Sequence, residues 1–419
     1  MKIVIIGNGI AGNQVAFGVR KQNQDAEILI LSAEAYPQYD PCALPYFLSN
    51  DIAYDAVFKR SIHEYERNNI ELRLNHKATW IDPLDKIVTT VQDHHIKYDK
   101  LVLAHGGDLF IPPIDGIHTP GVFRLKQLAD TERLNRHNGR RSVIIGSGAI
   151  GIEAAEALKK RGYGVSVIEL FEWILPTLFD PETANRLETN LKALGINVFT
   201  HETVTAIHGT SQVESVETDQ RTIPCDTVVL ATGVVPGMAL PKTAGIAVER
   251  GITVNERMET SIPDIYACGD CVETVDVCTG EDAMFQLKHN AIDQADVVAA
   301  NILGRHAVYP GAYAFARVHF FDTHASCFGK TTAATRCELG ELEIIEKSVS
   351  DGYLRLIVKE DRMVGVQALG SLADAIGFFI AKARRQDNVR HIRANWPRAK
   401  DPNSHYAWSD RLIGDLLSI

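Results

Sequence analysis

Two short stretches of the sequence carry glycines at a spacing that suits a phosphate-containing ligand. Gly7, Gly9 and Gly12 lie in GNGIAG, directly after the apolar run IVII and before a stretch of helical character. In such a turn the first glycine permits a tight bend, the second lets a diphosphate approach the backbone, and the third allows helix and strand to pack closely. The free N–H groups at the start of the helix favour negative charge. The turn is therefore predicted to bind a dinucleotide.

The same pattern recurs further along the chain. Gly146, Gly148 and Gly151 lie in GSGAIG, again between an apolar run, VII, and a helix-like stretch. One such turn is weak evidence, but two in the same local context predict two dinucleotide sites. The usual pair is a bound FAD and an exchangeable NAD.

An acidic residue follows each turn at about the distance along the chain where a ribose-binding carboxylate is expected. Glu34 comes after the run AEILIL, and Glu169 ends the run GVSVIE. A carboxylate there accepts hydrogen bonds from the ribose hydroxyls and repels a 2′-phosphate. No arginine directly follows Glu169, so the second site is predicted to prefer NAD to NADP.

The composition limits the remaining possibilities. The 419 residues are too many for one hydrophobic core, so two or three domains are expected. The net charge of −10 argues against nucleic acid or an anionic membrane as a partner. No apolar run approaches the roughly 18–20 residues of a membrane span, and the N-terminus is expected to be a strand and not a signal peptide. The seven scattered cysteines then suggest reduced thiols in a cytoplasmic protein.

Three further segments, together with the two glycine turns, resemble one known family. KLVLAHGG (Lys100–Gly107) and TVVLATGVVP (Thr227–Pro236) resemble its two strand-to-turn crossings between domains. TSIPDIYACGD (Thr260–Asp270) resembles its segment whose last aspartate binds the ribityl chain of the flavin. The chain thus resembles the FAD-dependent pyridine nucleotide–disulfide oxidoreductases, closely over about residues 1–305.

The resemblance implies an α/β fold with two Rossmann-like, three-layer domains, in which the NAD domain is inserted into the FAD domain. The FAD domain would comprise residues 1–110 and 237–305, and the NAD domain residues 111–236. Residues 306–419 would form a C-terminal α+β domain that serves as a dimer or partner interface.

The resemblance also implies the site residues. Glu153 would lie on the nicotinamide side, no metal site is expected, and His105 stands where the family usually has threonine. The residues implied for FAD are Gly7, Gly9, Gly12, Glu34, Cys42, Ala104, Gly106 and Asp270, and those implied for NAD are Gly146, Gly148, Gly151, Glu169 and Gly233.

Cys42, in YDPCALPY, separates two subfamilies. A second cysteine in a CxxxxC pair is missing, which excludes a dithiol of the glutathione reductase type. CALPY resembles the CGLPY of coenzyme A–disulfide reductases, which, like NADH oxidases and peroxidases, use one redox-active cysteine. Tyr39 and the stretch Leu44–Tyr46 equally fit rubredoxin reductases and the NADH-oxidising part of nitrite reductases. In that second group the flavin passes electrons to an iron–sulfur or other metal partner.

Three features bear on this choice. Ile10 stands where peroxidases carry histidine, and residues 395–408 contain Tyr406 but lack the C-terminal motif of coenzyme A–disulfide reductases. Residues 353–385 resemble the C-terminal domain of the second subfamily and predict a hairpin around Glu360–Arg362 followed by a helix. Whether Cys42 is redox active stays open.

The leading hypothesis is a flavoprotein that passes electrons between NAD(H) and an iron–sulfur partner. It would act as the NAD-reducing flavin subunit of a larger complex, such as a 2-oxoacid dehydrogenase, in a homodimer or a hetero-oligomer. The alternative is an NADH-dependent coenzyme A–disulfide or persulfide reductase, or an NADH oxidase, that uses Cys42.

Overall fold

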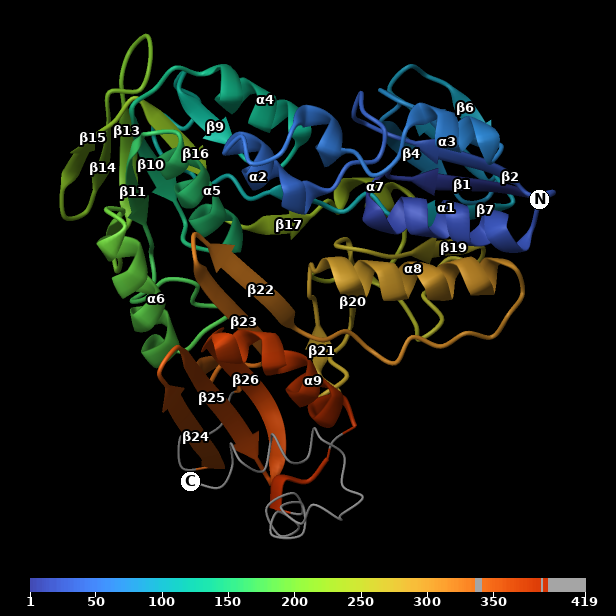
Figure 1. Cartoon of the computed structure of the whole chain (residues 1–419). Coiled ribbons are helices and arrows are strands. Elements are labelled where there is room, and N and C mark those ends of the chain that lie inside the picture. The colour runs from blue at the N-terminus through green and yellow to red at the C-terminus, as the bar shows by residue number, and fades with distance from the viewer. Residues whose placement is uncertain (336–340, 386, 391–419) are drawn as a thin grey trace. The chain divides into compact units, whose positions relative to one another are not determined.

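The computed structural model describes residues 1–335, 341–385 and 387–390, which fall into two compact units (Figure 1). The first unit comprises Met1–Phe110 and Val234–Tyr313, and the second comprises Ile111–Gly233 and the residues from Ala314 on. The chain therefore leaves the first unit, builds part of the second, returns and leaves again. The predicted three-domain boundaries, with 306–419 as a separate domain, stay a prediction.

A five-stranded parallel sheet forms the centre of the first unit. Its strands are continuous apolar runs because both faces of the sheet are covered by helices and other segments of the chain. Ile3, Val4 and Ile5, for example, are fully buried. Helices α1 and α8 pack against each other beside this sheet (Figure 1). In spatial order the strands are β19 (Ile265–Ala267), β7 (Lys100–Leu103), β1 (Lys2–Ile6), β2 (Glu27–Leu31) and β3 (Ile70–Arg73), and the two helices are α1 (Ile10–Gln22) and α8 (Lys288–Ile302).

Smaller elements complete the first unit. The first unit also contains an antiparallel sheet, a mixed sheet, a two-stranded antiparallel pair and three short helices. These elements are β4 (Ala78–Asp82), β5 (Ile87–Thr90) and β6 (His95–Lys97); β18 (Ile252–Thr253), β20 (Val272–Val275) and β21 (Asp282–Ala283); β8 (Gly107–Leu109) and β17 (Val234–Pro236); and α2 (Leu44–Leu48), α3 (Ile62–Arg67) and α7 (Ala239–Thr243).

The second unit contains another five-stranded parallel sheet. Its order places the strand before the second glycine turn in the centre, as in the first unit. The strands are, in spatial order, β12 (Asn197–Phe199), β11 (Gly164–Ile168), β10 (Arg141–Ile145), β16 (Thr227–Leu230) and β9 (Val122–Arg124), accompanied by α4 (Leu128–Arg136), α5 (Ala149–Lys160), α6 (Pro181–Ala193) and the antiparallel strands β13 (Val204–His208), β14 (Ser215–Thr218) and β15 (Thr222–Pro224). The predicted fold class, with two Rossmann-like sheets, is confirmed.

An antiparallel sheet with one helix follows in the same unit. The predicted hairpin is present: Glu360 and Asp361 connect its strands, and their φ angles of 49° and 60° suit the tight two-residue turn of a hairpin. Residues 395–408, including Tyr406, lie outside the described residues. The sheet runs β22 (Phe315–Phe320), β23 (Thr323–Gly329), β26 (Arg362–Gly370), β25 (Gly352–Lys359) and β24 (Leu342–Val349), and the helix is α9 (Ile376–Arg384).

Asp180 connects this antiparallel sheet to α6. Its carboxylate is fully buried and accepts hydrogen bonds from Thr332 Oγ1 at 2.8 Å, Arg355 Nε at 3.1 Å and Gln367 Nε2 at 2.9 Å. Because Asp180 directly precedes α6, these bonds fix the start of that helix on β25 and β26.

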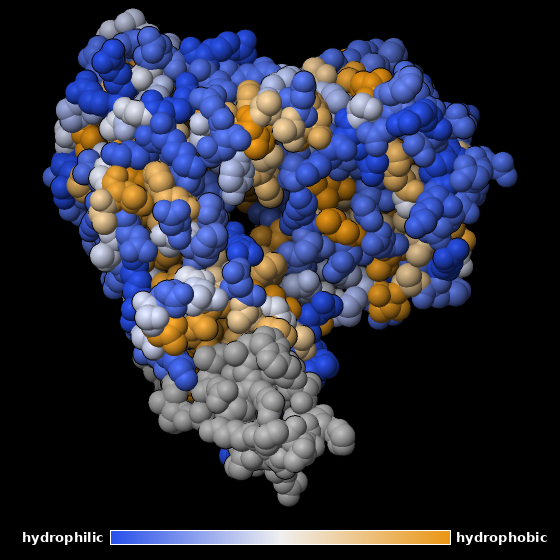
Figure 2. Space-filling model, in the orientation of Figure 1, coloured by the Kyte–Doolittle hydropathy of each residue, from blue (hydrophilic) through white to orange (hydrophobic). Residues whose placement is uncertain are grey.

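The surface matches the mixed composition of the sequence. Hydrophilic residues cover most of the face shown in Figure 2, and apolar residues occur there in small groups. Among the helices that the structure describes, none has both the length and the apolar character that crossing a bilayer requires.

Candidate active site

The first glycine turn can be built only with glycine at two of its three positions. Gly7 has a φ of +116°, and a Cβ atom there would lie 2.1 Å from the carbonyl oxygen of Ala104, which directly follows the neighbouring strand β7. At Gly12 an added Cβ would lie 2.0 Å from the carbonyl oxygen of Gly7. These contacts hold β1, β7 and α1 closer together than any side chain allows.

Gly9 differs from its two neighbours because the space in front of it is open. An added Cβ meets nothing within 4 Å, and Gly9 directly precedes α1, whose first N–H groups lack partners within the helix. A diphosphate can therefore reach the backbone at this position. The turn fits a dinucleotide as the sequence predicted.

The residues implied for FAD follow neighbouring strands of one parallel sheet. Asp270 comes after β19, Ala104 and Gly106 after β7, and Glu34 after β2, so all approach the sheet edge where the first glycine turn lies. This is the carboxyl edge, where open α/β sheets bind ligands. Glu34 lies beyond the end of β2 in a loop, half-buried, and Tyr39 donates a 2.8 Å hydrogen bond to its Oε2.

Cys42 is exposed, and it is the one exposed cysteine among those that the structure describes. It lies in a short 3₁₀ helix, Pro41–Ala43, and its backbone N–H donates to Asp40 Oδ1 at 3.1 Å. The contrast with other cysteines is clear, because burial raises the pKa of Cys225, Cys271 and Cys327 to about 12. Those three thiols are inert at neutral pH, whereas Cys42 can meet a reactant.

An ion pair that the sequence did not reveal fixes the segment before Cys42. Asp40 is buried, and Lys288 at the start of α8 reaches its Oδ2 at 2.6 Å, with Lys59 at 3.5 Å. Burial raises the pKa of Asp40, but Lys288, the Cys42 N–H and Lys59 lower it more, so the net shift is downward. Asp40 and Lys288 are far apart in the chain, and no local spacing announces their contact.

His105, which stands where the family usually has threonine, forms a hydrogen bond through its ring. Its Nε2 lies 2.8 Å from the carbonyl oxygen of Gly237, so this nitrogen carries the proton, and burial lowers the pKa of the ring. The buried Nδ1 has no hydrogen-bond partner in the part of the chain that the structure describes. His105 thus joins the end of β7 to the chain after β17.

The second glycine turn repeats the geometry of the first. Gly146 has a φ of +102° and an added Cβ would lie 2.4 Å from the carbonyl oxygen of Ala231, while one at Gly151 would lie 2.1 Å from that of Gly146. At Gly148, as at Gly9, an added Cβ meets nothing within 4 Å. The second turn therefore also fits a dinucleotide.

Glu169 directly follows β11 and is bonded to this turn. Its Oε2 accepts from the Ser147 N–H at 2.9 Å and the Ser147 hydroxyl at 2.5 Å, and its Oε1 accepts from the Phe171 N–H at 3.0 Å. A carboxylate oxygen accepts two hydrogen bonds, so Oε1 retains capacity for a ribose hydroxyl. The neighbours Leu170 and Phe171 are exposed and uncharged, and neither attracts a 2′-phosphate. Gly233, which follows β16, has a φ of +93°.

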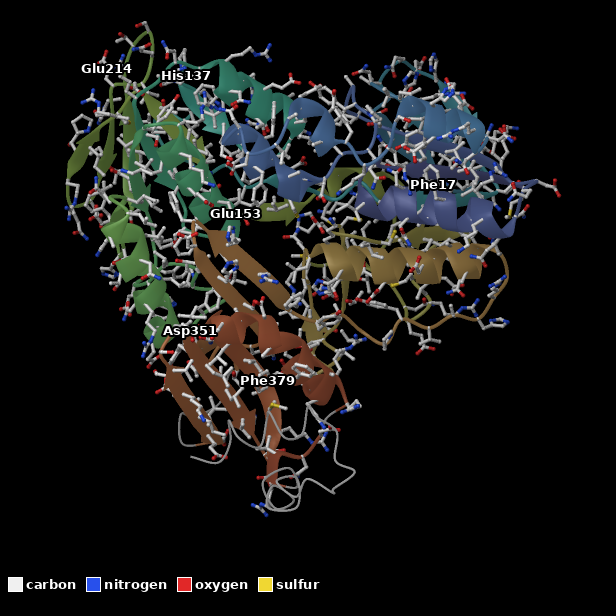
Figure 3. The ribbon with its side chains drawn as sticks, viewed as in Figure 1. Phe17, His137, Glu153, Glu214, Asp351 and Phe379 are labelled. Atoms are coloured by element: carbon white, nitrogen blue, oxygen red, sulfur yellow. The ribbon has the colours of Figure 1, made fainter. Side chains whose placement is uncertain are left out.

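Glu153 lies half-buried on α5, two residues after Gly151 of the second glycine turn (Figure 3). Burial raises the pKa of this carboxyl to about 7, and repulsion from Glu156 adds to the shift. Glu153 can therefore change charge near neutral pH, beside the position predicted for a nicotinamide dinucleotide.

The comparisons with known proteins agree with this geometry. A family model described as pyridine nucleotide-disulphide oxidoreductase matches residues 1–295. A protein of Methanocaldococcus jannaschii named NADH oxidase is 37% identical over 320 residues, which are 74% of this chain and 71% of that protein.

Two solved structures extend the similarity to the rest of the chain. The NAD-dependent persulfide reductase from A. fulgidus has a TM-score of 0.92 at 28% identity, covering 100% of this chain and 83% of that one. The ferredoxin reductase from Rhodopseudomonas palustris has a TM-score of 0.85 at 26% identity, covering 93% of this chain and 95% of that one.

Proposed function

Because this chain belongs to the pyridine nucleotide-disulphide oxidoreductase family, we propose that it passes electrons between NAD(H) and an iron–sulfur partner protein. The chain is a flavoenzyme that uses FAD and a nicotinamide dinucleotide. Bound FAD exchanges hydride with the nicotinamide and exchanges single electrons with a metal centre. The side chains have the task of binding, orienting and shielding the two rings.

We assign FAD to the first glycine turn and NAD(H) to the second. In the first unit the backbone at Gly9 would bind the diphosphate, Glu34 a ribose and Asp270 the ribityl chain, with Ala104, Gly106 and Cys42 beside the flavin. In the second unit Gly148 would face the diphosphate and Glu169 the adenosine ribose. The support is the open space at Gly9 and Gly148 together with the arrangement of these residues at the carboxyl edges of two parallel sheets.

The observation that carries the iron–sulfur partner is the similarity to a ferredoxin reductase over 93% of this chain. The residues up to Tyr313 make up less than 93% of the chain. The region of similarity therefore also includes the antiparallel sheet that follows Tyr313. The β25–β26 hairpin and α9 belong to that sheet, and their sequence resembles the rubredoxin and nitrite reductase group. Both similarities favour an acceptor or donor that takes electrons one at a time.

We further propose that the chain is the NAD-reducing subunit of a larger complex, such as phenylglyoxylate dehydrogenase. There, partner subunits would oxidise a 2-oxoacid with coenzyme A to an acyl-coenzyme A and carbon dioxide. The two electrons would pass singly through iron–sulfur clusters to the flavin, and NAD⁺ would leave as NADH. The support is the single cysteine in YDPCALPY.

A second candidate function is supported by the exposure of Cys42 and by the similarity to a persulfide reductase. In this alternative a thiolate at Cys42 would attack a disulfide, release one thiol and form a mixed disulfide; from a persulfide it would release hydrogen sulfide in place of that first thiol. Two electrons from NADH, passed through the flavin, would then break that bond and release the second thiol.

An anaerobic NADH titration of the wild type and Cys42→Ser distinguishes the two functions. We expect both proteins to take up about one NADH per flavin and to give the same visible spectra. Cys278→Ser, which changes a half-buried cysteine of the same unit, is the matched control.

The opposite result has a distinct signature. If the wild type takes up about two NADH per flavin and shows a long-wavelength band that only Cys42→Ser loses, the thiol reductase function replaces the proposed one. Rapid NADH-dependent reduction of coenzyme A disulfide by the wild type, also lost in Cys42→Ser, would lead to the same conclusion.

A further inference from the structure

Tyr65 lies outside every sequence motif, yet its hydroxyl contacts the first glycine turn. The side chain is fully buried in α3, and its oxygen lies 2.7 Å from Asn13 Oδ1 and 3.1 Å from Asn8 Oδ1. The ring packs edge-on against Phe17 of α1, labelled in Figure 3, with 5.6 Å between the ring centres. Tyr65 therefore contacts both the turn and the helix that follows it.

Asn13 transmits this contact to the backbone of the turn. Its side-chain amide donates to the carbonyl oxygens of Asn8 at 2.9 Å and Gly9 at 3.0 Å. Asn13 is buried, so these two carbonyls point into the protein. A carbonyl that faced a diphosphate would repel it, whereas a carbonyl bonded to Asn13 leaves the N–H groups of the turn to face the anion.

The same hydroxyl holds the segment that carries Glu34 and Cys42. The Gln38 N–H donates to it at 3.2 Å, and the Gln38 carbonyl accepts from the Lys59 N–H at 2.9 Å. Asn8 adds a second link, because its side-chain amide donates to the carbonyl oxygen of Tyr36 at 3.1 Å. The glycine turn and this segment therefore share one buried hydrogen-bond network.

We propose that Tyr65 is a positioning residue for FAD. The Tyr65 hydroxyl fixes the position of the first glycine turn relative to the segment from Glu34 to Cys42. This inference rests on the assignment of FAD to the first turn. Its physical basis is that one oxygen both donates to the turn and accepts from the segment, so neither can shift alone without leaving a buried polar group unpaired. Burial raises the pKa of Tyr65 to about 12, so the hydroxyl keeps its proton at neutral pH.

The test is Tyr65→Phe, and the chain offers a matched control. Tyr98 is also buried in the first unit, but its hydroxyl has no hydrogen-bond partner among the described residues. Each variant thus removes one buried oxygen and keeps the ring. We expect Tyr65→Phe to weaken FAD binding to the apoprotein about tenfold, in a fluorescence titration, and Tyr98→Phe to leave it within about twofold.

A second readout separates positioning from general stability. Visible circular dichroism of the bound flavin reports its surroundings, and we expect a changed spectrum in Tyr65→Phe alone. A lower melting temperature of the apoprotein with an unchanged FAD dissociation constant and an unchanged spectrum would overturn the proposal. If Tyr65→Phe does not fold, Asn13→Ser breaks the same network from the other end and the same two measurements apply.

A further variant shows which assumption has failed if FAD binding does not change. Gly9→Ala places a methyl group where the diphosphate is expected and should weaken FAD binding strongly. If Gly9→Ala weakens binding and neither Tyr65→Phe nor Asn13→Ser does, Tyr65 has no positioning role. If none of the three variants weakens binding, FAD is not bound at the first turn, and the site assignment itself is wrong.

Discussion

Glu153 is the residue whose ionisation most directly links the second site to pH. Burial, and then repulsion from Glu156, raise its pKa to about 7 from the ordinary value of 4.5. Below pH 4.5 the carboxyl is protonated in both the folded and the unfolded chain. Between these two values the folded chain retains a proton that the unfolded chain has released, so the free energy of unfolding falls as pH rises. The fall ends once pH exceeds about 7.

We therefore predict that Glu153→Gln removes a pH dependence of stability. From pH 5 to pH 8 the wild type should lose at most ~3 kcal/mol relative to the variant, and less to the extent that water reaches the carboxyl. Thermal unfolding at a series of pH values, without NAD, measures the difference. Glu172→Gln removes an exposed carboxylate of the same unit and serves as control. Parallel curves for wild type and Glu153→Gln would contradict the raised pKa.

At the scale of elements, two glycines of the second turn have different tasks: Gly148 is needed for ligand binding, and Gly151 is needed for folding. At Gly148 a φ of −62° and open space admit a methyl group, whereas at Gly151 a Cβ would collide with the carbonyl oxygen of Gly146. Gly148→Ala should keep its flavin and melting temperature but raise the KM for NADH about tenfold or more, because the methyl occupies the diphosphate position. Gly151→Ala should instead lower the melting temperature. Equal effects of the two substitutions on stability would contradict this division.

The link between α6 and the antiparallel sheet gives a second prediction at this scale. Arg355 is 6% exposed and bonds the fully buried carboxylate of Asp180. Arg355→Met leaves that charge without its cation, which in buried pairs costs about 3–5 kcal/mol. Arg317 and Asp374 form an exposed pair in the same sheet region, so Arg317→Met should cost less than ~1 kcal/mol. Thermal unfolding compares them, and equal losses would show that burial of the Asp180 pair has no special weight.

Local sequence patterns predicted the elements well because each element depends on its own residues. Ile3–Ile6 is apolar because a parallel strand is buried on both faces, and Glu360–Asp361 permits the tight turn of a hairpin. The network around Tyr65 and the Asp40–Lys288 pair were missed, because they join residues from different elements and follow no repeating spacing. The sequence also did not predict whether Cys42 is redox active. Its exposure follows from the fold, but its redox role depends on chemistry that neither the adjacent residues nor their spacing determine.

At the scale of the whole molecule, the chain builds two units with one dinucleotide site predicted in each. The first glycine turn lies in the unit of Met1–Phe110 and Val234–Tyr313, and the second lies in the unit that begins at Ile111. Their turns have nearly the same backbone geometry, so the glycines alone do not tell which site takes FAD. The assignment depends on the segments that follow the other strands, above all Thr260–Asp270.

Hydrogen exchange of the apoprotein tests this assignment across the whole chain. A ligand at about a hundred times its dissociation constant stabilises its site by about 2.7 kcal/mol, which slows exchange through ligand-releasing openings about a hundredfold. FAD should therefore protect amides of β1, β7 and α1, and NAD⁺ should protect amides of β10, β11 and α5. Gly148→Ala should reduce the protection by NAD⁺ about tenfold or more and retain that by FAD. The reverse pattern would mean that FAD binds at the second turn and NAD⁺ at the first. Protection of both units by each ligand would mean that the two turns do not discriminate between dinucleotides.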